Sequence, residues 1–331
     1  MIKATMHIGV LAFLMSVAAF AAQQAARKTA PAPLGLHAKT FDSPQQAADA
    51  LVDAAEGFDV RAFEEIFGPN GEDIVLSGEF PQDRQRASDF AAQAHEKKSV
   101  SVDPKSASRA FLVVGREDWQ FPAPLVRHGG KWSFDAAAGR QELLYRRIRS
   151  NELQAIEICH NYVGAQNKYA TNAGEYAERI ISRPGQKDGL AWQNPDGSWG
   201  GPIAAETARA IEEGYSSMAE PYHGYFFKIL KGQGPAAPLG EKDFTRKGIN
   251  SRGFALVASP AEYGVTGVQS FIVSHYGIIY EKDLGPASLN VFTDMDRFNP
   301  DHSWKPVVGM GKTERSNPTP APISKSRAGA H

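Results

Sequence analysis

The segment GFALVASPAEYGVTGVQSFIVSHYGIIYEKDLG, residues 253–285, decides the fold of the C-terminal half of this chain. Its short apolar runs lie at Phe254–Ala258, Ser270–Val273 and Ile278–Tyr280. Tyr276-Gly277 forms a turn before the last run, and a similar run covers Tyr225–Leu230. Short apolar runs bounded by turn residues are typical of strands. The segment therefore predicts a sheet in this half.

Helices are predicted ahead of these strands. Ser150-Asn151 can cap the N-terminus of a new helix, because short polar side chains accept hydrogen bonds from the first turn. Its apolar face carries Leu153, Ile156, Cys159 and Val163. We expect the helical stretch to reach about Glu213, with punctuation at Gly174 and Pro184. Helices followed by strands make an α+β unit.

The N-terminal half has the same order of elements. Helices are predicted to begin at Ser43-Pro44, Asp59 and Pro81, since serine and aspartate can cap a helix and proline suits its first turn. Gly68-Pro69 ends the second helix, and the third runs to His95. Strands follow at Ala110–Val114, Leu125–Val126 and Trp132–Phe134, the last two as a hairpin around Gly129-Gly130.

Composition is consistent with two α+β domains. The chain has 331 residues, 42% of them apolar and 22% charged, which is typical of a globular protein with two cores. Each domain is expected to pack helices on an antiparallel sheet. The predicted divisions are a signal peptide at 1–22, a flexible linker at 23–40, domains at 41–149 and 150–308, and a disordered tail at 309–331.

The N-terminus predicts export. Lys3 precedes an uncharged apolar run, Ile8–Phe20, and Ala19-Phe20-Ala21 offers the small residues that a signal peptidase needs, with cleavage after Ala21 or Ala22. The run is short of the roughly 20 residues that span a bilayer, so a retained membrane anchor is disfavoured. We expect a periplasmic or secreted protein without stable membrane insertion.

Charge and cysteine content exclude other classes. The net charge of -1 gives no field for nucleic acid, and no nucleic-acid partner is expected. Cys159 is the one cysteine, so no internal disulfide can form, and its neighbours Ile156, Ile158 and Val163 predict a buried thiol. The histidines are scattered singly without metal-ligand spacing. No cofactor, metal site or catalytic residue is assigned.

Several segments carry a family resemblance. FDSPQQAADALVDAAEGFD, FLVVGREDWQFPAPLVRHGGKWSFD, RRIRSNELQAIEICHNYV and PYHGYFFKIL, with the segment quoted first, resemble the bacterial exported family called domain of unknown function 2950. The likeness runs from about Phe41 to Lys305. It implies export but no activity.

Each half also resembles a known fold. The first half is similar to the cone-shaped fold of nuclear-transport-factor and cystatin type, in which a bent sheet wraps a helix and can leave a pocket. The second half is similar to the globular head of type IV pilins and type II secretion pseudopilins, which implies successive antiparallel strands laid on the helix from Asn151. That helix carries polar residues such as Glu152 and lacks the apolar anchor of pilins.

Two groups of aromatic residues are candidate binding sites. Tyr222, His223 and Tyr225 precede or enter a strand, and with Trp192 they can form a ligand cleft or simply pack on the helix. Trp119, Phe121 and Trp132 can line the pocket that the cone resemblance implies.

Three functions follow from these observations. The first is a non-catalytic interaction or assembly module with a protein partner in the cell envelope. The second is a small-ligand binding protein that uses the N-terminal pocket. The third is a hydrolase with His223 as general base, which requires a nucleophile or water held nearby.

Overall fold

The computed structural model describes residues 38–69, 71–216, 220–244 and 252–308. The predicted signal peptide, nearly all of the predicted linker and the predicted tail lie outside these residues. The chain divides into two compact units, with the boundary between Leu144 and Tyr145. Both units combine helices with largely antiparallel sheets, so the predicted α+β class is confirmed.

The helices of unit 1 begin where the sequence predicts. They are α2 (Pro44–Gly57), α3 (Val60–Phe67) and α4 (Phe80–Glu96), with the short 3-10 helix η1 (Glu72–Ile74) between the last two. The Ser43 hydroxyl accepts the Gln46 N–H at 3.1 Å, and Asp59 Oδ1 accepts the Ala62 N–H at 3.1 Å. Both caps satisfy backbone donors that a helix start leaves unpaired.

The sheet of unit 1 follows the helices. Its strands are β1 (Lys98–Asp103), β2 (Ser106–Val114), β3 (Trp119–Gln120), β4 (Leu125–His128) and β5 (Lys131–Phe134). They pair antiparallel in the order β1-β2-β4-β5, with β3 on β2. The hairpin around Gly129-Gly130 is confirmed, whereas β1 was not predicted.

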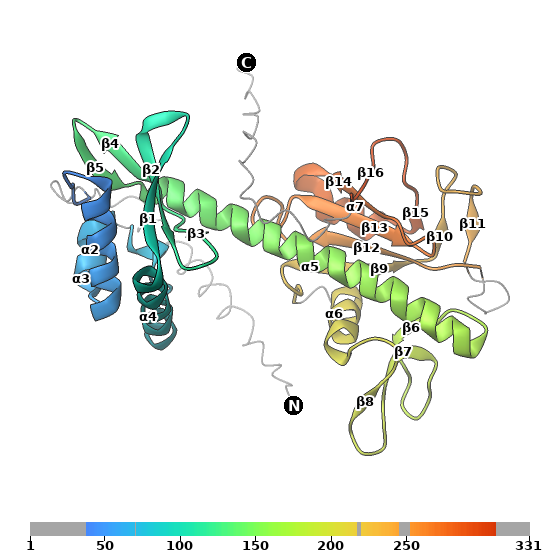
Figure 1. Ribbon diagram of the computed structural model, residues 1–331. Helices are drawn as coiled ribbons and strands as arrows, with labels where there is room; N and C mark the ends of the chain where they lie inside the picture. Colours follow the sequence, from blue (N-terminus) through green and yellow to red (C-terminus); the bar gives the residue numbers. More distant parts are fainter. Residues whose placement is uncertain (1–37, 70, 217–219, 245–251, 309–331) are drawn as a thin grey trace, which may run out of the picture. The chain divides into compact units, whose positions relative to one another are not determined.

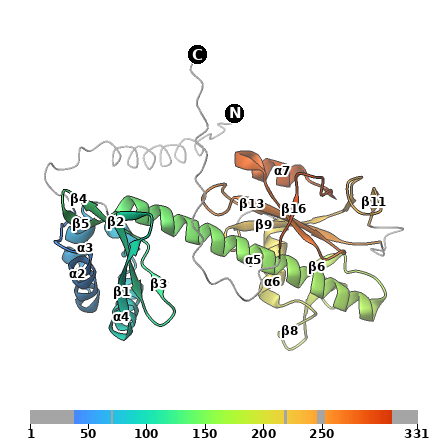
Figure 2. The same cartoon turned by 45° about the horizontal axis from the view of Figure 1, so that its top comes forward.

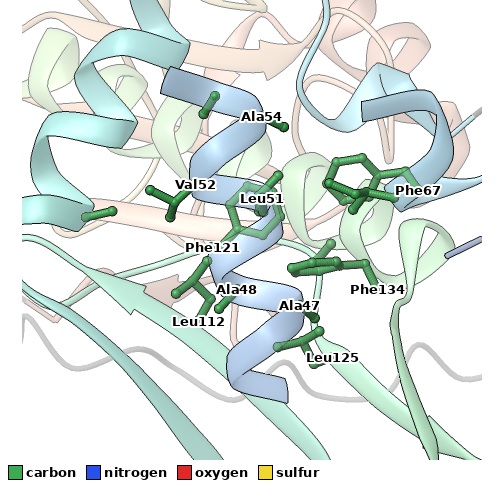
Figure 3. Packing of buried hydrophobic residues seen from close by; sticks show 14 of the residues in the cluster. Ala47, Ala48, Leu51, Val52, Ala54, Phe67, Leu112, Phe121, Leu125 and Phe134 are labelled. Carbon is green, nitrogen blue, oxygen red and sulfur yellow. The ribbon is translucent and has the colours of Figure 1, made fainter. Parts of the chain in front are cut away.

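The core of unit 1 lies between α2 and the sheet. Figure 3 shows Ala47, Ala48 and Leu51 of α2 close to Leu125 and Phe134 of the strands. These side chains are less than 4% exposed. Small residues along α2 allow its backbone to approach the strands closely, which places the larger rings around the helix.

Helix α5 (Ala136–Ala173) is the largest departure from the sequence prediction. Its start is fixed by Asp135, whose Oδ1 accepts the Ala138 N–H at 3.0 Å. The expected start at Ser150-Asn151 is wrong, because the helix runs through these residues without a break. The helix ends next to Gly174, where the sequence predicts punctuation of the helical stretch: this glycine has φ +75° and its N–H donates to the Ala170 carbonyl at 2.9 Å.

The main sheet of unit 2 contains β9 (Tyr225–Leu230), β12 (Ala255–Pro260), β13 (Gln269–Ser274), β14 (Ile279–Asp283) and β16 (Lys305–Pro306). The strands pair antiparallel in the order β16-β14-β13-β12-β9. The four apolar runs predicted as strands are therefore confirmed. Figure 2 shows α5 and α6 (Ala205–Ser216) on one face of this sheet and α7 (Ser288–Asp294) on the other.

Both faces of this sheet are buried, which explains the uninterrupted apolar strands. Along β12, Leu256 and Ala258 join a core with Cys159 and Tyr162 of α5. Ala255 and Val257 point into a second core, whose large side chains are Phe226, Phe244, Phe292, Phe298 and Trp304. Unit 2 thus holds two cores where one was expected.

Two small sheets complete unit 2. One contains β6 (Arg179–Ile181), β7 (Gly189–Gln193) and β8 (Trp199–Gly200), with β6 parallel to β7. The other contains β10 (Gly232–Gln233), β11 (Lys242–Asp243) and β15 (Arg297–Phe298), and η2 (Gly285–Ala287) precedes α7. The predicted helical stretch up to about Glu213 is wrong for residues 179–200, because β6, β7 and β8 lie there.

Figure 1 traces α5 from unit 1 into unit 2. Although this helix has 38 residues, no helix in the described ranges combines the length and apolar content that crossing a membrane requires.

Candidate functional site

A cavity of about 380 Å³ lies within unit 1. Its wall is formed by side chains of α2, α3 and α4, by the segment from Trp119 to Pro122, and by Leu143 of α5. The apolar lining residues from the helices include Leu51, Ala55, Phe63, Ala87 and Phe90. We call this site the aromatic cavity.

Three aromatic rings form one side of the aromatic cavity. The Phe90 ring lies 5.6 Å from that of Phe121 and 6.3 Å from that of Trp119, centroid to centroid, and the Trp119 and Phe121 rings are 6.2 Å apart. Two of these contacts are edge-to-face, a favoured geometry for aromatic pairs. Trp119 is 41% exposed and Phe121 only 4%, so the cluster runs from solvent into the core.

Polar side chains of the aromatic cavity come from one stripe of α4. Arg86, Asp89 and Gln93 line it, at helical spacings of three and four residues. Arg86 is held in place, since its guanidinium donates to Asp83 Oδ1 at 3.1 Å and to Gln82 Oε1 at 3.2 Å. An otherwise apolar cavity thus has one cation, one carboxylate and one amide at its edge.

Asp83 lies one turn before this stripe on α4 and fixes the start of the helix. It is 1% exposed, and its carboxylate accepts from the Ser77 hydroxyl at 2.7 Å, the Ser77 N–H at 2.9 Å and the Gly78 N–H at 3.1 Å. Burial opposes its ionisation, but these hydrogen bonds and Arg86 outweigh burial and lower the pKa of Asp83 below its usual value. The carboxylate is therefore charged and structural.

The structure brings two of the three predicted pocket residues together. Trp119 and Phe121 line the aromatic cavity. Trp132 does not: it lies on β5, is 7% exposed, and exchanges backbone hydrogen bonds with Phe41 at 2.8 Å. The contribution of α4 to the cavity was not predicted, although Phe90 is a large apolar residue within this helix.

The predicted group around His223 is a turn into β9. Tyr225 is fully buried, its hydroxyl donates to the Gln269 carbonyl at 2.8 Å, and burial raises its pKa. Tyr222 exchanges backbone hydrogen bonds with Tyr225 at 3.0 Å. His223 is exposed with φ +47°, and its ring centroid lies 4.2 Å from that of Tyr222. Tyr225 therefore contributes to packing.

Trp192 lies elsewhere, on β7. It lines a different cavity of unit 2, and neither Tyr222 nor His223 is among the residues that form that wall. Within the described part of the chain, no group of three or more His, Cys, Asp or Glu side chains is placed to hold a metal ion. Cys159 is fully buried as predicted, and burial raises its pKa to about 12.

Comparison with known proteins gives one match. No curated protein and no solved structure is significantly similar to the chain. The cone-fold and pilin-head resemblances are therefore without a structural neighbour that confirms them. A protein family of unknown function, DUF2950, matches residues 38–307. Because this match spans most of the 331 residues, the chain belongs to the DUF2950 family.

Proposed function

We propose that the protein binds a small, flat, largely apolar molecule in the aromatic cavity of unit 1. The observation that carries this proposal is a cavity of about 380 Å³ with an aromatic wall and a short polar stripe. Ligand sites commonly have roughly 300 to 1,000 Å³, mostly apolar walls and a few polar groups that orient the ligand. The volume lies near the lower limit, which favours a ligand of one or two rings.

The lining indicates how such a ligand would be held. Its ring would stack with Phe90, Trp119 and Phe121, whose spacing and tilt are typical of aromatic contacts. A polar substituent would reach Arg86 or Gln93 at the edge. Because Arg86 is already oriented by Asp83 and Gln82, little side-chain entropy is lost on binding.

The experiment compares two alanines of α4. Ala87 lines the aromatic cavity, whereas Ala92 is exposed on the same helix. Ala87→Phe fills the cavity and Ala92→Phe is the matched control, since both changes have the same effect on helix propensity. We expect anilinonaphthalene sulfonate, a fluorescent aromatic probe, to bind the native protein with one saturable site.

The proposal requires the two variants to differ. We expect Ala87→Phe to lose probe binding and Ala92→Phe to retain it, with both variants folded by circular dichroism. Equal binding by the two variants would place the probe elsewhere and contradict the proposal. Mass spectrometry of the protein purified from its own cells, under non-denaturing conditions, then identifies the natural ligand by its mass.

The other two functions have less support. An interaction module requires an exposed apolar patch. Among the described residues, the exposed large apolar side chains each lie on a different element or loop: Phe80, Val102, Trp119, Leu153, Leu239, Ile278, Val291 and Val308. The envelope partner stays a prediction. A hydrolase requires a polar partner for His223, and within the described ranges its ring makes an aromatic contact with Tyr222 and no hydrogen bond or ion pair.

We also propose that the protein acts outside the cytoplasm, in the periplasm or after secretion. Support comes from the sequence, in which Lys3 and the apolar run Ile8–Phe20 are typical of a signal peptide. A charge in that run, Leu14→Arg, is expected to stop export. Fractionation measures this effect, and the mass of the exported protein shows whether cleavage follows Ala21 or Ala22.

A further inference from the structure

A second cavity, of about 370 Å³, lies within unit 2. Its wall combines the last turns of α5, which supply Lys168, Tyr169 and Asn172, with Lys187 and Trp192 from the region of β7. We call this site the lysine pocket. It is separate from the aromatic cavity and shares no lining residue with it.

Trp192 supplies a flat wall that is held in place. Its side chain is half-buried, and a Cβ atom added at Gly200 would lie 2.7 Å from its Nε1 atom, so β8 packs against the edge of the indole. The Lys187 ammonium lies 5.0 Å from the ring centroid. An indole with its edge fixed and an ammonium over its ring offers both an apolar surface and a positive charge to a ligand.

Among the described residues, the lysines of this pocket are not paired with carboxylates. Within the described ranges, neither Lys168 nor Lys187 has a carboxylate within 4.0 Å, and the Asn172 amide has no hydrogen-bond partner. The Tyr169 hydroxyl is engaged differently, since it donates to the Lys187 carbonyl at 3.1 Å and ties the Lys187 loop to α5. Two lysines, one amide and the indole of Trp192 thus line the same pocket.

The carboxylate next to Lys187 in the sequence, that of Asp188, is paired with two arginines rather than with the pocket lysines. Asp188 is bound by Arg183 at 2.7 Å and by Arg179 at 3.6 Å, and it also accepts the Arg183 N–H at 3.0 Å. Glu175 and Glu178 do not line the pocket, although both act electrostatically on Tyr169, which does. Burial, with these carboxylates, raises the pKa of Tyr169, so its hydroxyl keeps the proton that it donates.

We propose that the lysine pocket binds an acidic sugar, a six-membered ring that carries a carboxylate. The C–H face of the sugar stacks on Trp192, the carboxylate lies between the ammonium groups of Lys168 and Lys187, and the Asn172 amide binds a ring hydroxyl. An aromatic acid shares the ring and the charge but lacks the hydroxyl groups, so the test includes one.

The experiment is a calorimetric titration of the full chain with three probes. They are a trisaccharide of galacturonic acid, its neutral methyl ester, and benzoate. We expect the acidic trisaccharide to bind and the methyl ester to bind at least tenfold more weakly. Raising NaCl from about 0.05 M to about 0.5 M weakens binding of the acid, because salt screens exposed charges. Binding of benzoate without the acidic sugar, or of both sugars equally, would overturn the proposal.

Variants then locate the binding. Lys168→Gln and Lys187→Gln are each expected to raise the Kd roughly threefold to tenfold, the range for one partly exposed charged contact. Lys105→Gln, in the turn between β1 and β2 of unit 1, is the matched control and leaves the Kd unchanged. Trp192→Leu loses the stacking and Trp192→Phe restores part of it, with thermal midpoints measured to show folding. An effect of Lys105→Gln equal to that of the pocket lysines would also overturn the proposal.

Discussion

The carboxylate of Asp83 accepts a hydrogen bond from the Ser77 hydroxyl at 2.7 Å, although Asp83 is almost wholly buried. The contact holds the segment before α4 against the first turn of that helix. Since α4 carries Arg86 and Phe90, the geometry of the aromatic cavity depends on it. The contribution of this carboxylate to stability can be tested through the pH dependence of the free energy of unfolding.

Asp83→Asn is expected to lower the free energy of unfolding by about 1 to 3 kcal/mol near neutral pH, because the amide cannot accept all the hydrogen bonds of the carboxylate. The pKa of folded Asp83 is below that of an unfolded chain, about 3.9. Ionised Asp83 therefore stabilises the fold above that pH, and this contribution is lost as the pH falls through the lower, folded-state pKa.

Urea unfolding at several pH values measures this effect. The difference between the native protein and Asp83→Asn should be largest near neutral pH and shrink below about pH 4. Asp89→Asn is the control, since Asp89 is exposed on the same helix. A difference that stays constant down to about pH 2 would show that ionisation of Asp83 does not stabilise the fold.

Two glycines of α5 should respond oppositely to alanine. A Cβ atom at Gly164 meets nothing within 4 Å, so Gly164→Ala should stabilise the protein by about 0.5 to 1 kcal/mol through helix propensity. A Cβ atom at Gly139 would lie 2.8 Å from the Cβ of Ala123, so Gly139→Ala should destabilise it. Thermal unfolding distinguishes them, and a shift in the same direction for both would contradict the packing at Gly139.

Cys159 should be unreactive in the folded protein. Its side chain is fully buried, and burial raises the pKa of the thiol to about 12, so almost no thiolate forms near neutral pH. A thiol reagent should therefore label the protein slowly in buffer and rapidly in concentrated urea. Because the chain contains one cysteine, the signal reports this site alone. Rapid labelling in buffer would mean that the core around α5 opens readily.

Glu152 should be more important than an exposed glutamate of the same helix. Its Oε1 atom accepts the N–H groups of both Val268 and Gln269 at 3.0 Å. Glu152→Ala leaves these donors unpaired, and we expect a loss of about 1 to 3 kcal/mol in the free energy of unfolding. Glu157→Ala, at an exposed position, should change it by less than about 0.5 kcal/mol. Equal urea midpoints for the two variants would contradict this role.

Elements set by local chemistry were predictable. Ser43 and Asp59 cap α2 and α3 through bonds to residues three positions ahead, so the sequence alone locates both helix starts. The apolar runs of the main sheet in unit 2 were equally clear. Asp135 offers the same capping signal before three alanines, and reading it would have placed the start of α5.

Ser150-Asn151 shows why the rest was not predictable. The pair has the composition of a helix cap, but the Asn151 amide donates to the Thr266 carbonyl at 2.8 Å, far away in the sequence. Tertiary contacts thus use a side chain that local rules assign to a helix end. The aromatic cavity could be predicted only in part. Trp119 and Phe121 are recognisable in the sequence as candidate lining residues, whereas the position of Phe90 depends on how α4 packs against the rest of unit 1.

The boundary between the two units falls inside α5, and this has a consequence for proteases. A protease cuts where several residues of backbone can unfold into its active site, and surface loops meet that need far better than helices. Here the junction has no loop, and Leu143 on one side and Ala155 on the other are anchored in separate cores. Limited digestion should therefore trim other segments before it parts the two halves, and gene fragments that stop at the junction would leave each half with a severed helix end.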